Sequence, residues 1–123
     1  MIIGVGIDLA DSRRIEKIYK RFGIKFAAKI LSPTELEKLP DDPIPYLAGR
    51  FAAREAFVKA LGTGFSKGVD WLDTRVENDR AGRPVVFLKG RAEVIARDLG
   101  VKQIHLSISH ERHYAVAMVI LEG

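Results

Sequence analysis

The alternation of apolar and polar residues divides the chain into short strands and helices. Residues 2 to 9 form an apolar run rich in β-branched side chains, closing with the acidic Asp8, and we expect a buried strand there. Helical spacing begins at about Ser12 and predicts a helix whose apolar stripe faces the core. The stripe consists of Ile15, Ile18, Tyr19 and Phe22.

Proline and glycine mark the limits of the next two predicted helices. Residues 32 to 35, Ser-Pro-Thr-Glu, combine a capping serine, a proline at the first helical position and a glutamate able to complete a capping box, so a short helix to about Leu39 is predicted. The three prolines of residues 40 to 45 cannot continue a helix and predict a loop. A central helix is expected from about Tyr46 to Leu61, closed by glycine in the left-handed conformation.

The second half of the chain predicts two pairs of strands. Residues 69 to 79 and 85 to 89 are expected to be extended and joined by a turn, and a helix over 91 to 99 follows. Residues 104 to 109 and 114 to 121 are typical of a hairpin with a four-residue connection. Without repeats or linkers, residues 1–123 are predicted to be a single α+β domain, with a largely antiparallel sheet packed with helices.

Composition limits the kinds of site, location and partner that such a domain can have. The 123 residues include no cysteine, which excludes disulfides and thiolate metal sites. The N-terminal segment lacks a basic region and Asp8 interrupts its apolar run, while the apolar run near the C-terminus is too short to span a bilayer. We therefore expect a soluble, cytoplasmic protein with no membrane association. A formal net charge of +4 favours an acidic partner.

The central helix carries more charge than an Ala-rich helix suited to burial requires. Glu55 and Lys59 stand one turn apart on one face, and Arg50 and Arg54 share another. A substrate or a metal ion could supply their missing partners. The alternative is an ordinary core helix with ion pairs at its rim.

Asp8 is the other acid in an unusual place. A carboxylate that closes a buried strand must be paired, bind a cation or lie near water. Capping the following helix is its ordinary structural role. If Asp8 and Glu55 meet in space, two hard oxygen ligands without histidine or thiolate suit Mg²⁺, which commonly completes its shell with water and substrate phosphate.

Two further motifs allow both a functional and an ordinary interpretation. Gly62-Thr63-Gly64 could bring backbone amides close to a phosphate, yet these residues follow a helix rather than open one, so they are not a P-loop and could simply end that helix. His110 and His113 lie at a turn, where one could contact substrate. They lack the cysteines or HExxH helix typical of a zinc site, and no GxSxG motif supports a serine hydrolase.

The outer side of the first helix forms a basic bar, which consists of Arg13, Arg14, Lys17, Lys20 and Arg21. Such a surface is most often simply solvated. Five cations on one helix could also bind an acidic helix of a partner protein. A basic, non-catalytic RNA-binding module is the second hypothesis, although nucleic-acid binding usually interleaves aromatic residues with the charge.

Three segments together resemble one known family. They are GVGIDLADSRRIEK at residues 4–17, GRFAAREAFVKALGTG at 49–64 and HLSISHERHYAVAMVILE at 105–122. In order and spacing the chain is similar to the small bacterial 4'-phosphopantetheinyl transferases of the holo-[acyl-carrier-protein] synthase family, whose Gly-x-Pro turn resembles residues 79–84.

The resemblance implies a reaction and a set of site residues. The 4'-phosphopantetheine arm of coenzyme A would move to a serine of apo acyl carrier protein, releasing adenosine 3',5'-bisphosphate. Asp8 and Glu55 would be the Mg²⁺ ligands, and Lys59 would contact the phosphates and assist the leaving oxygen. The coenzyme A site would be lined by Arg50, Lys59, Gly62, Thr63, Gly64, Arg83, Pro84 and His110.

The resemblance also implies partners. Arg14, with Arg13, Lys17 and Arg21 beside it, would meet the acidic helix of the carrier protein. Members of the family are homotrimers with clefts between subunits, so the site residues need not all come from one chain. Phosphoryl transfer asks the protein chiefly to position groups and neutralise charge, and the attacking serine belongs to the partner. The general base remains open between Glu55 and a water molecule on the metal.

Overall fold

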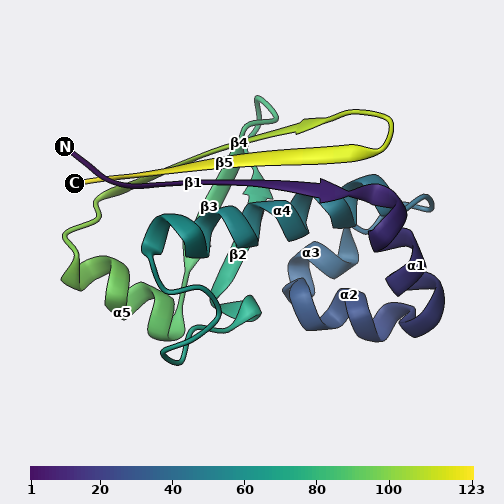
Figure 1. Ribbon diagram of the computed structural model, residues 1–123, viewed down its shortest axis with the longest axis horizontal. Helices are drawn as coiled ribbons and strands as arrows, with labels where there is room; N and C mark the ends of the chain where they lie inside the picture. The colour runs from purple at the N-terminus through teal and green to yellow at the C-terminus, as the bar shows by residue number, and fades with distance from the viewer.

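The computed structural model describes residues 1–123, arranged as two antiparallel sheets and five α-helices (Figure 1). Their order along the chain is β1 (Ile2–Asp11), α1 (Ser12–Phe22), α2 (Ile24–Ile30), α3 (Pro33–Glu37), α4 (Ile44–Leu61), a 3₁₀ turn η1 (Trp71–Asp73), β2 (Thr74–Asn78), β3 (Pro84–Leu88), α5 (Gly90–Asp98), β4 (Gln103–His110) and β5 (Tyr114–Glu122). The predicted α+β class is confirmed. No helix combines the length and apolarity that crossing a bilayer requires.

The larger sheet has the order β1-β5-β4, so the two chain termini lie side by side at one end of it (Figure 1). Both strand pairs are antiparallel, and the register places Asp8 opposite Ala117. Helix α4 runs along one face of this sheet, with α1, α2 and α3 gathered at one of its ends and α5 at the other (Figure 1). Strands β2 and β3 form a separate hairpin.

Helix α4 packs directly against the backbone of β1. A Cβ atom added to Gly4 would overlap the carbonyl oxygen of Ala60, and one added to Gly6 would overlap that of Ala56. The two glycines and the small alanines facing them let helix and strand approach more closely than ordinary side chains allow. This contact fixes how β1 and α4 present their polar residues to one another.

Helix α4 is buried around most of its circumference, and two core clusters meet along it. The larger cluster lies between α4, the three-stranded sheet and α5, and includes Phe57 and Val119. The smaller cluster joins α4 to α1 and α2 and includes Ile15 and Leu47. Each charged side chain that points inward from such a helix needs an ionic or hydrogen-bonding partner.

Arg54 meets that requirement through an internal ion pair. Its side chain is fully buried and bonds to both carboxylate oxygens of Glu35, at 2.5 and 3.1 Å. It also donates to the carbonyl oxygens of Trp71 and Thr74. Arg54 therefore ties α3 and η1 to the central helix. For this charge the alternative of an ordinary core helix with ion pairs is the correct one.

Several boundaries differ from those predicted, each for a local reason. Strand β1 continues to Asp11, and it is Asp11, not Asp8, that caps α1, accepting a hydrogen bond from the Arg13 amide at 2.9 Å. Helix α4 begins at Ile44, because Pro45 lies in the first turn, where no amide donor is needed.

Two expectations about the helices near the N-terminus were wrong or incomplete. Phe22 was predicted to face the core, but it is 52% exposed, whereas Ile15 is buried. Helix α2 was not predicted at all, since Gly23 separates it from α1 by a single residue. The capping box at Ser32 and Glu35, by contrast, is confirmed.

The glycine contact yields a direct test of the fold. In the Gly6→Ala variant the new methyl group collides with a backbone carbonyl that cannot rotate away, so helix and strand must separate. We expect the free energy of unfolding to fall by roughly 1–3 kcal/mol or more, measured by urea denaturation. Gln103→Ala, at an exposed position of β4, is the control and should change little. An unchanged unfolding midpoint in Gly6→Ala would contradict the close contact.

Candidate active site

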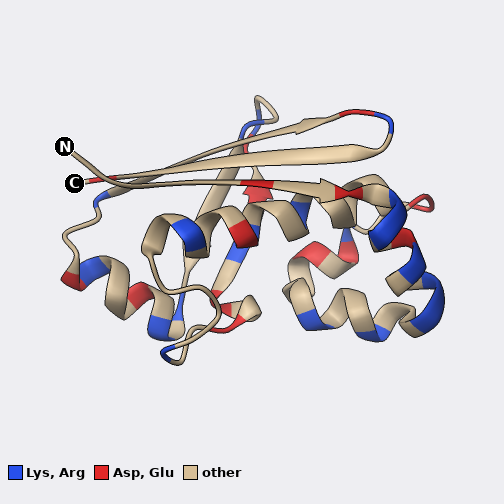
Figure 2. Ribbon diagram, in the orientation of Figure 1, with Lys and Arg blue, Asp and Glu red and all other residues tan.

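Asp8 and Glu55 line one cavity. The cavity has a volume of about 250 Å³ and lies between β1, α1 and α4, and it is bounded by Asp8, Leu9, Ala10, Asp11, Arg14, Ile15, Phe51 and Glu55. Acidic positions of β1 and α4 also lie close together in Figure 2. The structure therefore brings together two acids that are separated by 46 intervening residues in the sequence.

The alternation of β1 explains how Asp8 reaches this cavity. Its neighbours Ile7 and Leu9 point to the outer face of the sheet, where each is more than half exposed. Asp8 points the other way, toward α4, and its side chain is only 15% exposed. Gly6 packs directly against the backbone of Ala56. This contact also sets how far Glu55, the residue before Ala56, lies from the strand.

The electrostatics of the cavity favour a cation. Burial raises the pKa of the Glu55 carboxyl, and the nearby charge of Asp8 raises it further, while Lys59 and Arg14 oppose the change. The net effect is that ionised Glu55 is destabilised in the folded protein. A cation placed between the two carboxylates would stabilise the ionised form of Glu55. It would thereby offset both the effect of burial and the repulsion from Asp8.

Lys59 is already oriented toward Asp8. Its Nζ atom donates to Asp8 Oδ1 and to the carbonyl oxygen of Ile7, both at 3.0 Å. The side chain is 51% exposed. An ammonium group has three N–H donors, so the third remains for an anion that approaches from solvent.

Arg14 was predicted to bind a partner, but it also lines the cavity of Asp8 and Glu55. Two other cations of the basic bar have partners within the chain. Arg13 forms an ion pair with Asp11 at 2.9 Å, and Lys20 pairs with Glu16 at 3.5 Å. Arg14, Lys17 and Arg21 form no ion pair and are exposed, and Figure 2 shows the basic positions of α1 in a row along the helix.

Arg50 does not face the Asp8 cavity. Its side chain is nine-tenths buried, with the guanidinium 4.3 Å from the centre of the Tyr46 ring and Nε 3.9 Å from a Glu35 oxygen. No hydrogen bond reaches Nε. Since Glu35 is already bonded twice by Arg54, this cluster holds one more cation than anion.

The remaining residues predicted for coenzyme A are spread over the chain. His110 closes β4 and lies over the first half of α4, whereas Gly62 to Gly64 follow the C-terminal end of that helix. Gly62 adopts the left-handed conformation that ends the helix, as predicted. Arg83 and Pro84 lie at the β2–β3 turn, with the amide of Arg83 bonded to Asp79. None of these lines the cavity of Asp8 and Glu55 within one chain.

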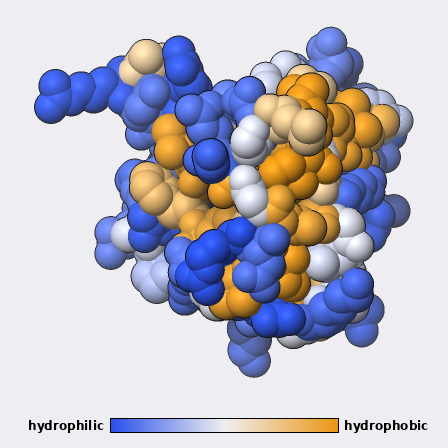
Figure 3. Space-filling model, turned by 90° about the vertical axis from the view of Figure 1, so that its left-hand side faces the viewer, coloured by the Kyte–Doolittle hydropathy of each residue, from blue (hydrophilic) through white to orange (hydrophobic).

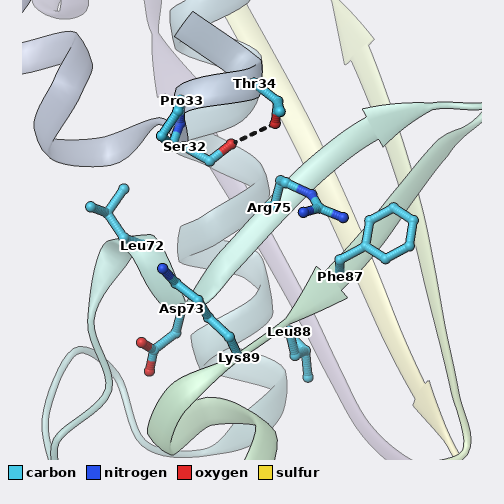
Figure 4. A pocket seen from close by; sticks show the side chains of 9 residues that line it. All are labelled: Ser32, Pro33, Thr34, Leu72, Asp73, Arg75, Phe87, Leu88 and Lys89. Carbon is cyan, nitrogen blue, oxygen red and sulfur yellow. Dashed lines mark hydrogen bonds between the residues drawn. The ribbon is translucent and has the colours of Figure 1, made fainter.

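A second cavity, of about 200 Å³, lies between α3 and the two-stranded sheet (Figure 4). Its main polar groups are already engaged. Arg75 stacks on Phe87 and contacts Glu77 at 2.7 Å, and Asp73 accepts a hydrogen bond from the first turn of α5 at Ala92. The cavity contains none of the residues predicted for the active site.

The sequence of the chain matches a known family. A model of the 4'-phosphopantetheinyl transferase superfamily matches residues 4–119. The chain belongs to this superfamily. It is 50% identical to the holo-[acyl-carrier-protein] synthase of Desulfovibrio desulfuricans over 123 residues, covering 100% of this chain and 99% of the relative. The family resemblance seen in the sequence is thereby confirmed.

Solved structures agree over the whole length. The holo-[acyl-carrier-protein] synthase of Neisseria meningitidis matches with a TM-score of 0.92 at 38% identity and covers 100% of both chains. The enzyme of Helicobacter pylori, in complex with coenzyme A, matches with a TM-score of 0.86 at 33% identity, over 96% of this chain and 99% of that one.

The raised pKa of Glu55 makes a prediction for the metal-free protein. The folded state holds this proton more tightly than the unfolded chain does, so stability decreases as pH rises through the raised pKa, and the cost persists at neutral pH. Glu55→Gln removes the ionisation. We expect this variant, in EDTA, to melt at a higher temperature than the wild type at pH 7, and the difference to shrink as pH falls through the carboxyl range.

Glu16→Gln is the matched control, because Glu16 is exposed on α1. It should show no such gain at pH 7. A Glu55→Gln protein that is less stable than the wild type at pH 7 would show that the carboxylate is not disfavoured in this cavity.

Proposed function

We propose that this protein transfers the 4'-phosphopantetheine group of coenzyme A to a serine of apo acyl carrier protein, giving holo acyl carrier protein and adenosine 3',5'-bisphosphate. The observation that carries the proposal is the convergence of Asp8 and Glu55 on one cavity, beside Lys59, in a chain that belongs to the phosphopantetheinyl transferase superfamily. In this proposal residues 1–123 are one transferase domain that serves fatty acid biosynthesis in the cytoplasm.

The donor set of the cavity fits Mg²⁺. Asp8 and Glu55 contribute hard carboxylate oxygens, and Mg²⁺ is usually bound by one or two carboxylates together with water and substrate phosphate. The chain has no cluster of three or more His, Cys, Asp or Glu side chains that would complete a metal shell alone. When bound, the metal supplies neutralisation of the charge on the diphosphate of coenzyme A.

Lys59 has a second role in this scheme. Its two hydrogen bonds, to Asp8 and to the Ile7 carbonyl, fix the ammonium group at the edge of the cavity. The remaining N–H can donate to a phosphate oxygen and stabilise the charge that grows on the leaving group. The nucleophile comes from the carrier protein, so the chain itself needs no activated serine or cysteine.

The outer face of the three-stranded sheet supports assembly with further copies of the chain. Large apolar side chains face outward in adjacent strands, with Ile7 opposite Met118 and Leu9 opposite Val116. Figure 3 shows hydrophobic residues exposed at the upper right of one end of the molecule, beside hydrophilic ones at the upper left. We infer a homotrimer, as the family resemblance implies, in which this face is covered and a neighbouring copy completes the coenzyme A site.

Helices α1 and α2 offer a surface for the carrier protein. A cavity of about 300 Å³ between them is lined by Ile18, Phe22, Lys25, Phe26 and Lys29. It continues the row of unpaired cations Arg14, Lys17 and Arg21. An amphipathic acidic helix fits this combination, because its apolar side can enter the groove while its carboxylates meet the cations.

The activity can be tested by weighing the carrier protein. Incubation with coenzyme A, Mg²⁺ and apo acyl carrier protein should add the phosphopantetheine mass to the carrier, detected by mass spectrometry. Asp8→Ala should abolish this modification, because one carboxylate and the anchor of Lys59 are lost together. Asp41→Ala, which removes an exposed loop acid, is the control and should act like the wild type.

Transfer that persists in Asp8→Ala would contradict the proposed site. Steeply salt-dependent RNA binding that is indifferent to Mg²⁺ would favour the RNA-binding hypothesis.

The assembly makes a separate prediction. Leu9→Asp places a charge in the centre of the exposed apolar face, where Leu9 is 64% exposed in the single chain. We expect light scattering after size exclusion to show a trimer for the wild type and a monomer for this variant, which should remain folded by circular dichroism. A wild-type protein that is monomeric at micromolar concentration would refute the assembly.

A further inference from the structure

Gly49 is the only glycine within α4, in a helix that otherwise uses alanine at its small positions. A glycine inside a helix is destabilising relative to alanine, because it loses more backbone conformational freedom on folding. Its backbone is not in the left-handed conformation that would require glycine. The reason for glycine at this position must therefore be space.

The space is occupied by His110. A Cβ atom at position 49 would lie 2.8 Å from His110 Nε2, 3.2 Å from its Cε1 and 3.3 Å from Cγ2 of Ile108. The imidazole thus lies directly on the helix surface that Gly49 leaves bare. Any larger residue would have to push the ring away.

The ring is also held by a hydrogen bond that Gly49 makes accessible. His110 Nε2 lies 3.0 Å from the carbonyl oxygen of Pro45, one turn earlier in α4. A carbonyl oxygen can only accept, so Nε2 must carry the proton. In the neutral ring this leaves Nδ1 as the free acceptor, which defines both the tautomer and the orientation of the imidazole.

The position of this ring matters because His110 borders two hollows. One, of about 360 Å³, is also lined by Leu9, Ser109, Glu111, Tyr114 and Val116, and the other, of about 290 Å³, extends toward Ser12 and Arg13 at the start of α1. A ring whose orientation is already fixed between the two hollows can contact a ligand there without losing rotamer freedom on binding. Exposed histidines without such packing sample several rotamers.

We infer that Gly49 is a positioning residue, whose missing side chain fixes the His110 imidazole for contact with coenzyme A. This inference rests on the proposed function, in which His110 lines the coenzyme A site. Gly49 itself contributes no group to the ligand and acts only through the ring.

The inference predicts that stability and binding change in opposite directions. In Gly49→Ala the clashing atoms are mainly the far end of a side chain that can rotate, so the fold survives, and alanine favours the helix. We expect a melting temperature equal to or above that of the wild type. The dissociation constant of coenzyme A, measured by calorimetry with Mg²⁺ present, should nevertheless rise by up to about tenfold, which corresponds to the loss of one hydrogen bond that Nδ1 accepts from the ligand. In turnover, the KM for coenzyme A should rise more than kcat falls.

Two comparisons separate this role from a merely structural one. His110→Ala should weaken coenzyme A binding by a similar factor, and the double variant Gly49→Ala with His110→Ala should bind no more weakly than His110→Ala alone, because Gly49 acts only through the ring. Without ligand, the ¹⁵N and ¹³C signals of the His110 ring should move in Gly49→Ala, as its bond to Pro45 is lost.

The outcomes that overturn the inference are distinct from those that overturn the proposed function. Unchanged ring signals and wild-type affinity in Gly49→Ala would refute it, as would an equal further loss in the His110→Ala background. If the wild-type protein transfers no phosphopantetheine but binds coenzyme A with the predicted dependence on Gly49, the proposed reaction fails and the positioning role stands.

Discussion

The close contact between α4 and β1 is the constraint on which the rest of this structure depends. Gly4 and Gly6 bring the strand backbone against the carbonyl groups of Ala60 and Ala56, with no side chain between them. At this separation the residues next to the contact, Asp8 beyond Gly6 on the strand and Glu55 before Ala56 on the helix, reach the same cavity. Backbone packing therefore determines that Asp8 and Glu55 lie at one cavity, and their charges determine what that cavity can bind.

The charges of α4 divide by the environment into which each one points. Arg54 points into the core and is satisfied by Glu35 and by two carbonyl oxygens, so it holds the helices together. Glu55 and Lys59 point to the cavity edge, where one carboxylate is disfavoured and one ammonium keeps a free donor. The interpretation as a core helix with internal ion pairs is confirmed for Arg54, and Glu55 and Lys59 lie on another face, where the binding interpretation stays a prediction.

This division explains what the sequence could and could not predict. The strands and most helices follow from periodicity, and the family motifs predict Asp8, Glu55 and Lys59 as site residues. Sequence spacing cannot tell that Arg54 is internal, because its partner Glu35 lies 19 residues away on another helix. Nor could periodicity alone separate α2 from α1 across Gly23. A serine, aspartate or asparagine at the start of a helix is a signal that could have favoured Asp11 over Asp8 as the cap.

The alternation of β1 links the candidate site to the proposed assembly surface. Successive side chains of a strand point to opposite faces, so placing Asp8 toward α4 places Ile7 and Leu9 outward. A one-residue slip of β1 against β5 would exchange the two faces, burying the apolar side chains and losing the acid from the cavity at once. The proposed assembly through the apolar outer face therefore bears on the candidate site as well. Because the two faces are linked through one register, a neighbour that covers Ile7 and Leu9 also holds Asp8 in the only register in which it meets Glu55.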